Sequence, residues 1–427
     1  MLNLSRTSIQ NTRQIQWLEL QKQLIYLQRK SEFYKRKFKE LDIDVNKIAT
    51  YEDLSRIPIT SKEDLQRFNE DFICVPKTEI IDFVTTSGTL GKPVNLALNE
   101  PDLERLALNE MRSFELVGVK KEDVVQITTT LDRRFMAGMA YFLGLRKLGA
   151  GIVRTGSGLP QLQWDSIERF QPKYLVAVPS FLLKIIEYAV ENKIDYKNSS
   201  LRAAVCIGEP IRNLDNTLNA LGTKITELWD IELFSTYAST EMATAFTECE
   251  FHSGNHIQPD LIYTEILNEA GNPVNEGEPG ELVITTLQNQ TMPLLRFATG
   301  DILTYSEKPC KCGRNTLRLS ALIGRKSQMI KLKGTSIYPQ NIIEVLNGMD
   351  EIKNFVIEAK SGIAGMDEVF VKIPDTVSTN NLFLLKDAFK AKILVTPTIE
   401  RVPDVVINEL KFQKDAGKAR IFIDYRY

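Results

Sequence analysis

The feature that most constrains the fold is an alternation of apolar runs and helix-like segments between residues 80 and 240. Three short apolar runs are expected to form strands: residues 124–127, 174–178 and 203–207. Helices are expected between them, at residues 102–114, 181–191 and 211–221. Because this alternation places helices on the faces of a mostly parallel sheet, the sequence predicts a large N-terminal α/β domain.

Segments on either side of this region have other patterns. Residues 14–41 are expected to form one amphipathic helix, and Thr60-Ser61-Lys62-Glu63 has the pattern of a capped helix start. A β-rich subdomain is expected at about residues 245–324, and a small α+β domain at residues 325–427. The strands expected in these parts are residues 261–266, 281–286, 302–305, 354–359, 369–373 and 403–407, with a helix at residues 382–392.

Composition excludes several classes of protein. The chain has 53 Lys and Arg against 55 Asp and Glu, so no charge excess favours nucleic acid or an anionic membrane as a partner. The polar first 16 residues lack the apolar core of a signal peptide. No run approaches the roughly 20 apolar residues of a spanning helix. We therefore expect a cytoplasmic location, and no disulfide framework from the five cysteines.

A loop rich in hydroxyls and glycines follows the β-rich run that begins at residue 82. Its sequence is Ser87-Gly88-Thr89-Leu90-Gly91-Lys92-Pro93. Glycines allow close approach of an anion to backbone N–H groups, and Lys92 adds a positive charge. The spacing differs from that of the common P-loop. A phosphate loop and an ordinary flexible turn both remain open for this segment alone.

Four further segments carry polar groups suited to nucleotide chemistry. Gly208-Glu209-Pro210 follows the expected strand 203–207, where open α/β sheets bind ligands. Tyr237-Ala238-Ser239-Thr240-Glu241 combines a flat ring, hydroxyls and a carboxylate. Asp301 is able to accept hydrogen bonds from both ribose hydroxyls. Taken singly, the segments at 208–210 and 301 are as readily turns, and the basic stretch after Gly324 also fits a plain linker and strand.

Together these segments resemble the adenylate-forming enzymes, and most closely the phenylacetate–coenzyme A ligase family, over nearly the whole chain. The resemblance implies that the loop residues Ser87, Gly88, Thr89, Gly91 and Lys92 hold phosphates. It places Gly208, Glu209, Pro210 and Tyr237 around adenine, Ala238 and Ser239 at the nucleotide, Thr240 at the phosphate, Glu241 on Mg²⁺ and Asp301 on ribose. Arg325 is implied at the ribose or phosphate beside an inter-domain hinge. Leu90, Ala238, Ser327 and Gln328 depart from the usual pattern.

The same resemblance implies that Lys418, in Gly417-Lys418, is the adenylation lysine. A cation that reaches the substrate carboxylate and the α-phosphate stabilises the charge spread over the transferring group. Lys411 and Lys414 are weaker rivals, and an isolated lysine is ordinarily a solvated surface residue.

A metal site is expected from the placement of cysteine and histidine. Cys249-x2-His252-x3-His256 is followed by Cys310-x-Cys312, so three of five cysteines and both histidines fall in two short segments. Cys249, Cys310, Cys312 and one histidine would form a closed structural zinc site. His256 resembles the ligand of related ligases better than His252. The alternative is a group of unliganded surface residues.

The resulting expectation is an AMP-forming acid–thiol ligase with an adenylation domain at residues 1–324 and a mobile C-terminal lid at residues 325–427. Mg-ATP and a carboxylic acid, aromatic by resemblance, give acyl-AMP, and coenzyme A then takes the acyl group. A carrier protein or another nucleophile is the alternative acceptor, and a non-catalytic nucleotide-binding protein is the alternative of another class. Apolar segments 134–139 and 149–158 suit an aryl or alkyl acid. No nucleic acid or membrane partner is expected, and a homodimer is left open.

Overall fold

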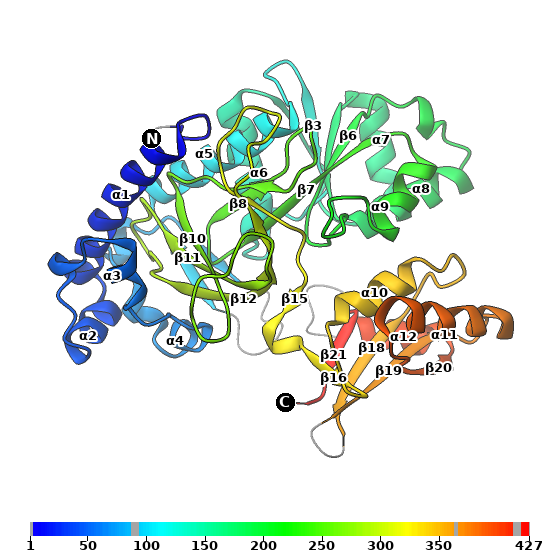
Figure 1. Cartoon of the computed structure of the whole chain (residues 1–427). Coiled ribbons are helices and arrows are strands. Elements are labelled where there is room, and N and C mark those ends of the chain that lie inside the picture. Colours follow the sequence, from blue (N-terminus) through cyan, green and yellow to red (C-terminus); the bar gives the residue numbers. More distant parts are fainter. Residues whose placement is uncertain (1–2, 87–93, 363–365, 413–419, 427) are drawn as a thin grey trace. The chain divides into compact units, whose positions relative to one another are not determined.

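The computed structural model describes residues 3–86, 94–362, 366–412 and 420–426. Contacts divide the chain into two compact units. The large unit comprises Met1–Thr217, Lys224–Thr299 and Leu303–Ala321, and the small unit comprises Leu218–Thr223, Gly300–Ile302 and Leu322–Tyr427. Within the described ranges, every helix is too short or too polar to cross a lipid bilayer. Each unit is described separately below (Figure 1).

Two helices, not one, form the N-terminal part of the large unit. The expected helix over residues 14–41 is wrong in this respect, because α1 (Ile9–Lys30) ends at Ser31 and α2 (Glu32–Glu40) begins there. The Ser31 hydroxyl accepts a hydrogen bond from the Tyr34 backbone N–H at 3.3 Å and donates to the Asp71 carbonyl at 3.1 Å. Ser31 therefore separates the two helices, because it caps the second one and is also bonded to a residue outside both.

The predicted parallel sheet is confirmed. The described strands form a nine-stranded sheet in the order β13-β14-β9-β8-β7-β6-β5-β3-β4. The part from β7 to β4 is parallel, and β8, β9, β14 and β13 continue it with antiparallel pairing. The strands are β3 (Val124–Ile127), β4 (Gly151–Arg154), β5 (Tyr174–Ala177), β6 (Ala203–Cys206), β7 (Glu232–Ser239), β8 (Thr244–Thr247), β9 (Asn255–His256), β13 (Tyr305–Ser306) and β14 (Arg318–Leu319).

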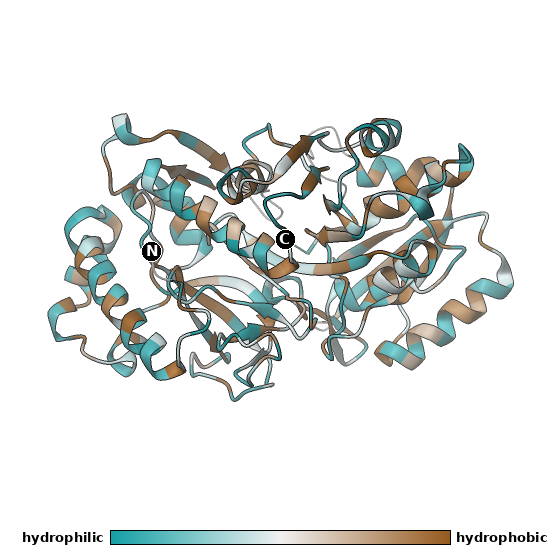
Figure 2. Ribbon diagram, turned by 90° about the horizontal axis from the view of Figure 1, so that it is seen from above, coloured by the Kyte–Doolittle hydropathy of each residue, from teal (hydrophilic) through white to brown (hydrophobic). Residues whose placement is uncertain are grey.

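Helices connect the parallel strands, as the alternation predicts. They are α6 (Met136–Leu148), α7 (Pro160–Phe170), α8 (Pro179–Glu191) and α9 (Ala220–Leu228), and α5 (Glu100–Val117) precedes the first of these strands, β3. The expected helix at residues 211–221 is wrong, because a turn occupies most of it and α9 begins only at Ala220. The helices carry both hydrophobic and hydrophilic residues (Figure 2), as expected when one face is buried.

The structure also has a second sheet and a hairpin; in that sheet, residues 300–302 and 324–325 belong to the small unit and the rest to the large unit. The strands β10 (Ile262–Leu267), β11 (Gly280–Thr286), β12 (Phe297–Leu303) and β15 (Gly324–Arg325) follow one another in the sheet, while β1 (Asp82–Thr85) pairs with β2 (Asn95–Leu98). Short helices precede them: α3 (Tyr51–Ser55), α4 (Lys62–Arg67), η1 (Val45–Lys47), η2 (Asn69–Phe72) and η3 (Lys77–Glu79). Ser61 caps α4 in a capping box with Asp64, which confirms the predicted helix start.

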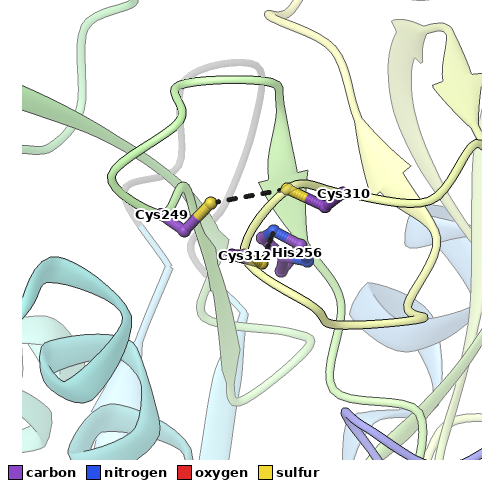
Figure 3. A group of neighbouring side chains, drawn as sticks. All are labelled: Cys249, His256, Cys310 and Cys312. Atoms are coloured by element: carbon purple, nitrogen blue, oxygen red, sulfur yellow. Dashed lines mark hydrogen bonds between the residues drawn. The ribbon is translucent and has the colours of Figure 1, made fainter.

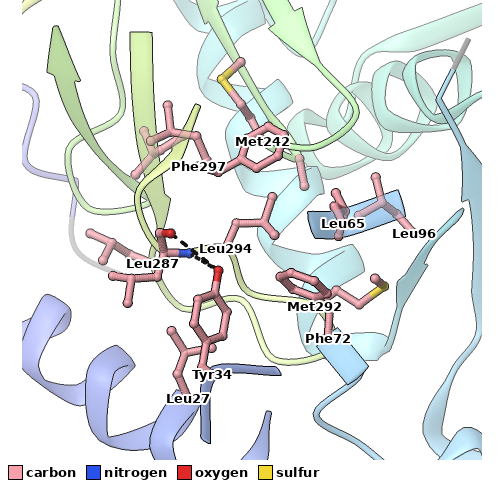
Figure 4. Packing of buried hydrophobic residues seen from close by; sticks show 14 of the residues in the cluster. Leu27, Tyr34, Leu65, Phe72, Leu96, Met242, Leu287, Met292, Leu294 and Phe297 are labelled. Atoms are coloured by element: carbon pink, nitrogen blue, oxygen red, sulfur yellow. Dashed lines mark hydrogen bonds between the residues drawn. The ribbon is translucent and has the colours of Figure 1, made fainter. Parts of the chain in front are cut away.

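One hydrophobic cluster joins the N-terminal helices to the second sheet. Figure 4 shows Leu27 and Tyr34 of the first two helices packed with Leu294 and Phe297. The Tyr34 hydroxyl accepts a hydrogen bond from the Leu295 backbone N–H at 2.9 Å. Met242, from the turn after β7, is fully buried in the same cluster. The core therefore extends beneath the turn that carries Thr240 and Glu241.

The small unit is an α+β arrangement with its own hydrophobic core. Its main sheet has the order β20-β19-β18-β21, and β16 pairs with β17 in a separate hairpin. The expected strand at residues 403–407 is wrong, because Pro403 precedes a helix there. The elements are η5 (Lys326–Gln328), β16 (Ile330–Leu332), β17 (Thr335–Ile337), α10 (Pro339–Asn347), β18 (Val356–Ser361), β19 (Asp367–Pro374), α11 (Thr379–Ile393), β20 (Thr398–Val402), α12 (Asp404–Lys411) and β21 (Phe422–Asp424).

Candidate active site and cysteine cluster

Two of the candidate segments lie next to each other at the carboxyl edge of the parallel strands. Gly208-Glu209-Pro210 follows β6, and Tyr237 to Ser239 form the end of the neighbouring strand β7. Gly208 has a φ of 77°, a left-handed conformation that suits glycine at this turn. The Tyr237 ring stacks on Phe246 of β8, with ring centroids 6.2 Å apart. The structure thus brings together the residues expected around adenine at the ligand-binding edge of the sheet.

Glu209 has a structural partner that the sequence analysis missed. Its carboxylate accepts hydrogen bonds from the Ser180 backbone N–H at 2.8 Å and from the Ser180 hydroxyl at 2.9 Å. Ser180 lies in the first turn of α8, whose preceding residue Val178 offers no side-chain cap. Glu209 therefore caps this helix from the neighbouring loop, and its negative charge lies at the positive end of the helix dipole.

Thr240 and Glu241 occupy the tight turn between β7 and β8. The Ala243 N–H donates to the Thr240 carbonyl at 3.2 Å, and the Met242 N–H donates to the Ser239 hydroxyl at 3.3 Å. The Glu241 side chain is largely buried, and its carboxylate is 3.5 Å from the Lys62 ammonium. The sequence pattern indicates Lys62 only as part of a helix start. It is the cation beside the candidate magnesium ligand, from a segment 179 positions earlier in the sequence.

The remaining candidates fall in two groups. Ser87, Gly88, Thr89, Gly91 and Lys92, together with Lys418, lie outside the described residues. The residues on either side of the first segment are described. The Thr86 N–H donates to the Val94 carbonyl, and the Val94 N–H donates to the Thr86 hydroxyl, both at 3.0 Å. In the small unit, Asp301 and Arg325 face each other across the β12–β15 pairing, with Nε and Oδ1 3.3 Å apart.

The four candidate zinc ligands form one buried cluster. The donor atoms of Cys249, His256, Cys310 and Cys312 all lie within 4.8 Å of one another (Figure 3). The Sγ atoms of Cys249 and Cys310 are 3.6 Å apart, as are the Cys312 Sγ and the His256 Nε2. Tetrahedral zinc with its usual bond lengths requires donor separations of about 3.5–3.8 Å. The arrangement therefore fits a four-coordinate metal site, and all five cysteines are free of disulfides.

The surroundings of His256 favour its role as a neutral ligand. Its Nδ1 is 2.7 Å from the Thr316 hydroxyl, which leaves Nε2 facing Cys312 when Nδ1 carries the proton. Burial, followed by the charges of Arg314 and Arg318, lowers the pKa of His256 to about 3, so the imidazole is neutral at pH 7. His252 lies elsewhere, with its ring nitrogens 3.0 Å from Glu232 and 3.2 Å from Glu248. Of the two histidines, the structure places His256 in the cluster.

The parallel sheet with a polar carboxyl edge and the separate α+β unit form the mixed α/β architecture of the adenylate-forming fold. The chain belongs to the AMP-binding enzyme family, whose profile matches residues 26–292. This match confirms the AMP-binding family that the sequence motifs indicate, and the sheet topology with the structural similarity given below confirms the fold class.

Known proteins similar to this chain include two curated ligases. Phenylacetate-coenzyme A ligase of Thermus thermophilus is 29% identical over 347 residues, which cover 80% of this chain and 76% of that protein. The Escherichia coli enzyme of the same name is 28% identical over 318 residues, covering 73% and 70%. Among solved structures, 2-hydroxyisobutyryl-CoA ligase in the postadenylation state with R3-HIB-AMP has a TM-score of 0.85 at 24% identity, covering 99% of this chain and 91% of that one.

Proposed function

We propose that the protein is an ATP-dependent acyl-CoA ligase that converts a carboxylic acid to acyl-AMP and then to an acyl thioester of coenzyme A. The observation that carries the proposal is the neighbouring placement of the Gly208–Pro210 loop and the Tyr237–Glu241 strand end at one edge of the parallel sheet. Membership of the AMP-binding family and the two similar phenylacetate-coenzyme A ligases support it. ATP, Mg²⁺ and coenzyme A fit this family of enzymes.

In the first half-reaction the carboxylate oxygen attacks the α-phosphorus and pyrophosphate leaves. Tyr237 packs on adenine, Thr240 binds a phosphate oxygen and Glu241 would hold Mg²⁺, with Ser87 to Lys92 around the leaving phosphates. Lys418 neutralises charge on the transferring group. Positioning and electrostatics dominate such a step, because the protein forms no covalent bond in it.

In the second half-reaction the thiol of coenzyme A attacks the acyl carbonyl and AMP leaves. We assign residues 1–324 as the adenylation domain and residues 325–427 as the lid that exchanges Lys418 for the thiol. Within the small unit, Arg325 holds Asp301, the proposed ribose ligand, by an ion pair. The similar ligases favour an aromatic acid of the phenylacetate kind.

The cysteine cluster is proposed to hold a structural zinc ion. Four protein donors leave no open coordination position, so the ion would stabilise the fold and take no part in the reaction. It would join the chain after β8 and strand β9 to the segment at Cys310 and Cys312.

The test is an acid-panel assay on the full-length protein, with pyrophosphate release and thioester formation measured by mass spectrometry. We expect release that depends on an acid and on Mg²⁺, and an acyl-CoA product. Glu241→Gln should lower the rate of release on the order of 100-fold, while Glu232→Gln, at the start of β7, should retain it. Pyrophosphate release without a coenzyme A thioester would indicate a carrier-protein or other acceptor. ATP binding with no turnover across the panel would refute the ligase proposal.

A further inference from the structure

Helix α5 carries a row of buried polar side chains on one face. Asp102, Arg105, Asn109 and Arg112 are spaced by three, four and three residues, which places them along one side of a helix. All four are at least 95% buried. Each binds atoms of much later segments: Asp102 accepts from the Gln290 and Thr291 N–H groups, and Asn109 exchanges two hydrogen bonds with the Ala245 backbone. A polar row of this kind fixes the position of what it binds.

Arg105 is the member of this row that reaches the turn after β7. Its Nη1 donates to the Ala243 carbonyl at 2.8 Å. Its Nη2 donates both to the Thr244 hydroxyl at 3.0 Å and to the Leu261 carbonyl at 2.5 Å. Its Nε donates to the Leu287 carbonyl at 2.8 Å. The guanidinium therefore connects the turn after β7 to the residue just before β10 and to the residue just after β11.

The turn has a geometry that needs such support. Ala243 adopts a φ of 45°, a left-handed conformation that a residue with a Cβ rarely takes. The Thr244 hydroxyl, which accepts from Arg105, donates in turn to the Met242 carbonyl at 3.0 Å. Arg105 thus holds the two residues after Glu241, Ala243 directly and Met242 through Thr244.

We propose that Arg105 is a positioning residue that sets the orientation of Glu241 for the Mg²⁺–nucleotide complex. The inference rests on the proposed function, because Glu241 is the magnesium ligand only in that reading. Arg105 does not touch substrate in this role. It acts through Ala243, Thr244 and Met242, so its substitution should change the step that requires Mg-ATP and leave the thioester-forming step nearly unchanged.

Arg112 supplies a matched control on the same helix face. It is also buried, but its guanidinium pairs with the Asp260 carboxylate at 2.8 Å. Arg112→Lys and Arg105→Lys each disrupt the hydrogen bonds of a buried guanidinium, and only Arg105→Lys disrupts bonds to the turn. A merely structural role predicts the same behaviour for both variants.

The experiment compares ATP–pyrophosphate exchange as a function of Mg²⁺ concentration with thioester formation from a synthetic acyl-adenylate. For Arg105→Lys we expect the half-maximal Mg²⁺ concentration to rise by about 10-fold or more, the usual effect of disturbing the support of a metal ligand. Thioester formation should stay close to wild type once corrected for the folded fraction. Arg112→Lys should lower the melting temperature without moving the Mg²⁺ midpoint.

A second variant covers the case in which Arg105→Lys does not fold. Thr244→Val is nearly isosteric and removes only the hydroxyl between Arg105 and Met242, so it should shift the Mg²⁺ midpoint in the same direction by a smaller factor. Equal midpoints for Arg105→Lys and Arg112→Lys, or an unchanged midpoint for Thr244→Val when Arg105→Lys is unfolded, would overturn the inference. Absence of exchange in the wild-type protein would instead overturn the proposed function.

Discussion

Removing the zinc ion proposed for the cysteine cluster should lower the stability of the large unit by an amount set by the length of the loop between its ligands. Cys249 and Cys310 are 61 positions apart, and their sulfurs meet in one cluster. In the chain-entropy model, a cross-link that closes a loop of that length raises the free energy of the unfolded chain by about 4 kcal/mol. A metal bridge closes the same loop. In a unit of roughly 300 residues, about 4 kcal/mol corresponds to a fall in melting temperature of about 6 °C.

The measurement is thermal unfolding in the absence of nucleotide, with and without a zinc chelator, together with metal analysis of the purified protein. We expect one zinc ion per chain and a fall of about 6 °C with chelator. His256→Gln should start from the lower melting temperature and lose its response to chelator.

The other histidine gives the matched control. His252 is bonded to Glu232 and Glu248 and lies outside the cluster, so His252→Gln should keep the full response to chelator. A chelator effect of the same size in His256→Gln and in wild type, or protein purified from zinc-containing medium without zinc, would refute the reasoning.

Three further predictions follow from single carboxylates. Glu241→Gln should lower the rate of adenylation on the order of 100-fold, measured as pyrophosphate release at saturating ATP, and raise the Mg²⁺ requirement; an unchanged Mg²⁺ midpoint would count against the assignment. Glu209→Ala removes the cap of α8 and should cost about 1 kcal/mol, seen as a lower denaturant midpoint with an unchanged slope. Burial raises the pKa of Glu110 from 4.5 to about 8. Between about pH 4.5 and 8 the carboxyl is therefore protonated in the folded state, whereas the unfolded chain has lost the proton. Its contribution to stability is full below pH 4.5 and is lost as the pH rises through 8. Glu110→Gln should melt higher than wild type above pH 8 and nearly equally at pH 5; parallel pH profiles would contradict this.

Sequence patterns predicted the parts of the fold that local periodicity controls. The strands β3, β5 and β6 and the helices α5 and α8 lie where the alternation of apolar and amphipathic runs indicates, because burial on both faces of a parallel sheet imposes that pattern. The Ser61 capping box was also predictable, since its partner Asp64 is only three residues away.

Errors arose where side chains compete locally with helix formation. Residues 211–221 have apolar residues at helical spacing, but the Asp215 carboxylate accepts from the Thr217 N–H and the Asn216 residue has a φ of 67°. Such side-chain turns favour a loop over a helix. At residues 403–407 a β-branched run suggested a strand, while Pro403 followed by Asp404 starts α12 in the structure.

The candidate site was predictable from motifs only where its residues are contiguous. Tyr237 to Glu241 and the cysteine–histidine segments are of this kind. Lys62 beside Glu241 and Arg105 behind the turn were missed, because each meets its partner more than 130 positions later in the chain. A charged residue on the inner face of an expected helix was the available signal for Arg105.

The polar face of α5 also bears on how the chain behaves while it is being synthesised. The partners of Asp102, Arg105, Asn109 and Arg112 lie 136–189 positions downstream, so at ordinary translation speeds α5 waits roughly 7–40 s for them outside the ribosome. During that interval an equally buried but apolar face would be open to aggregation. Charged and amide groups stay hydrated instead, and they exchange water for backbone partners only when the later strands have arrived.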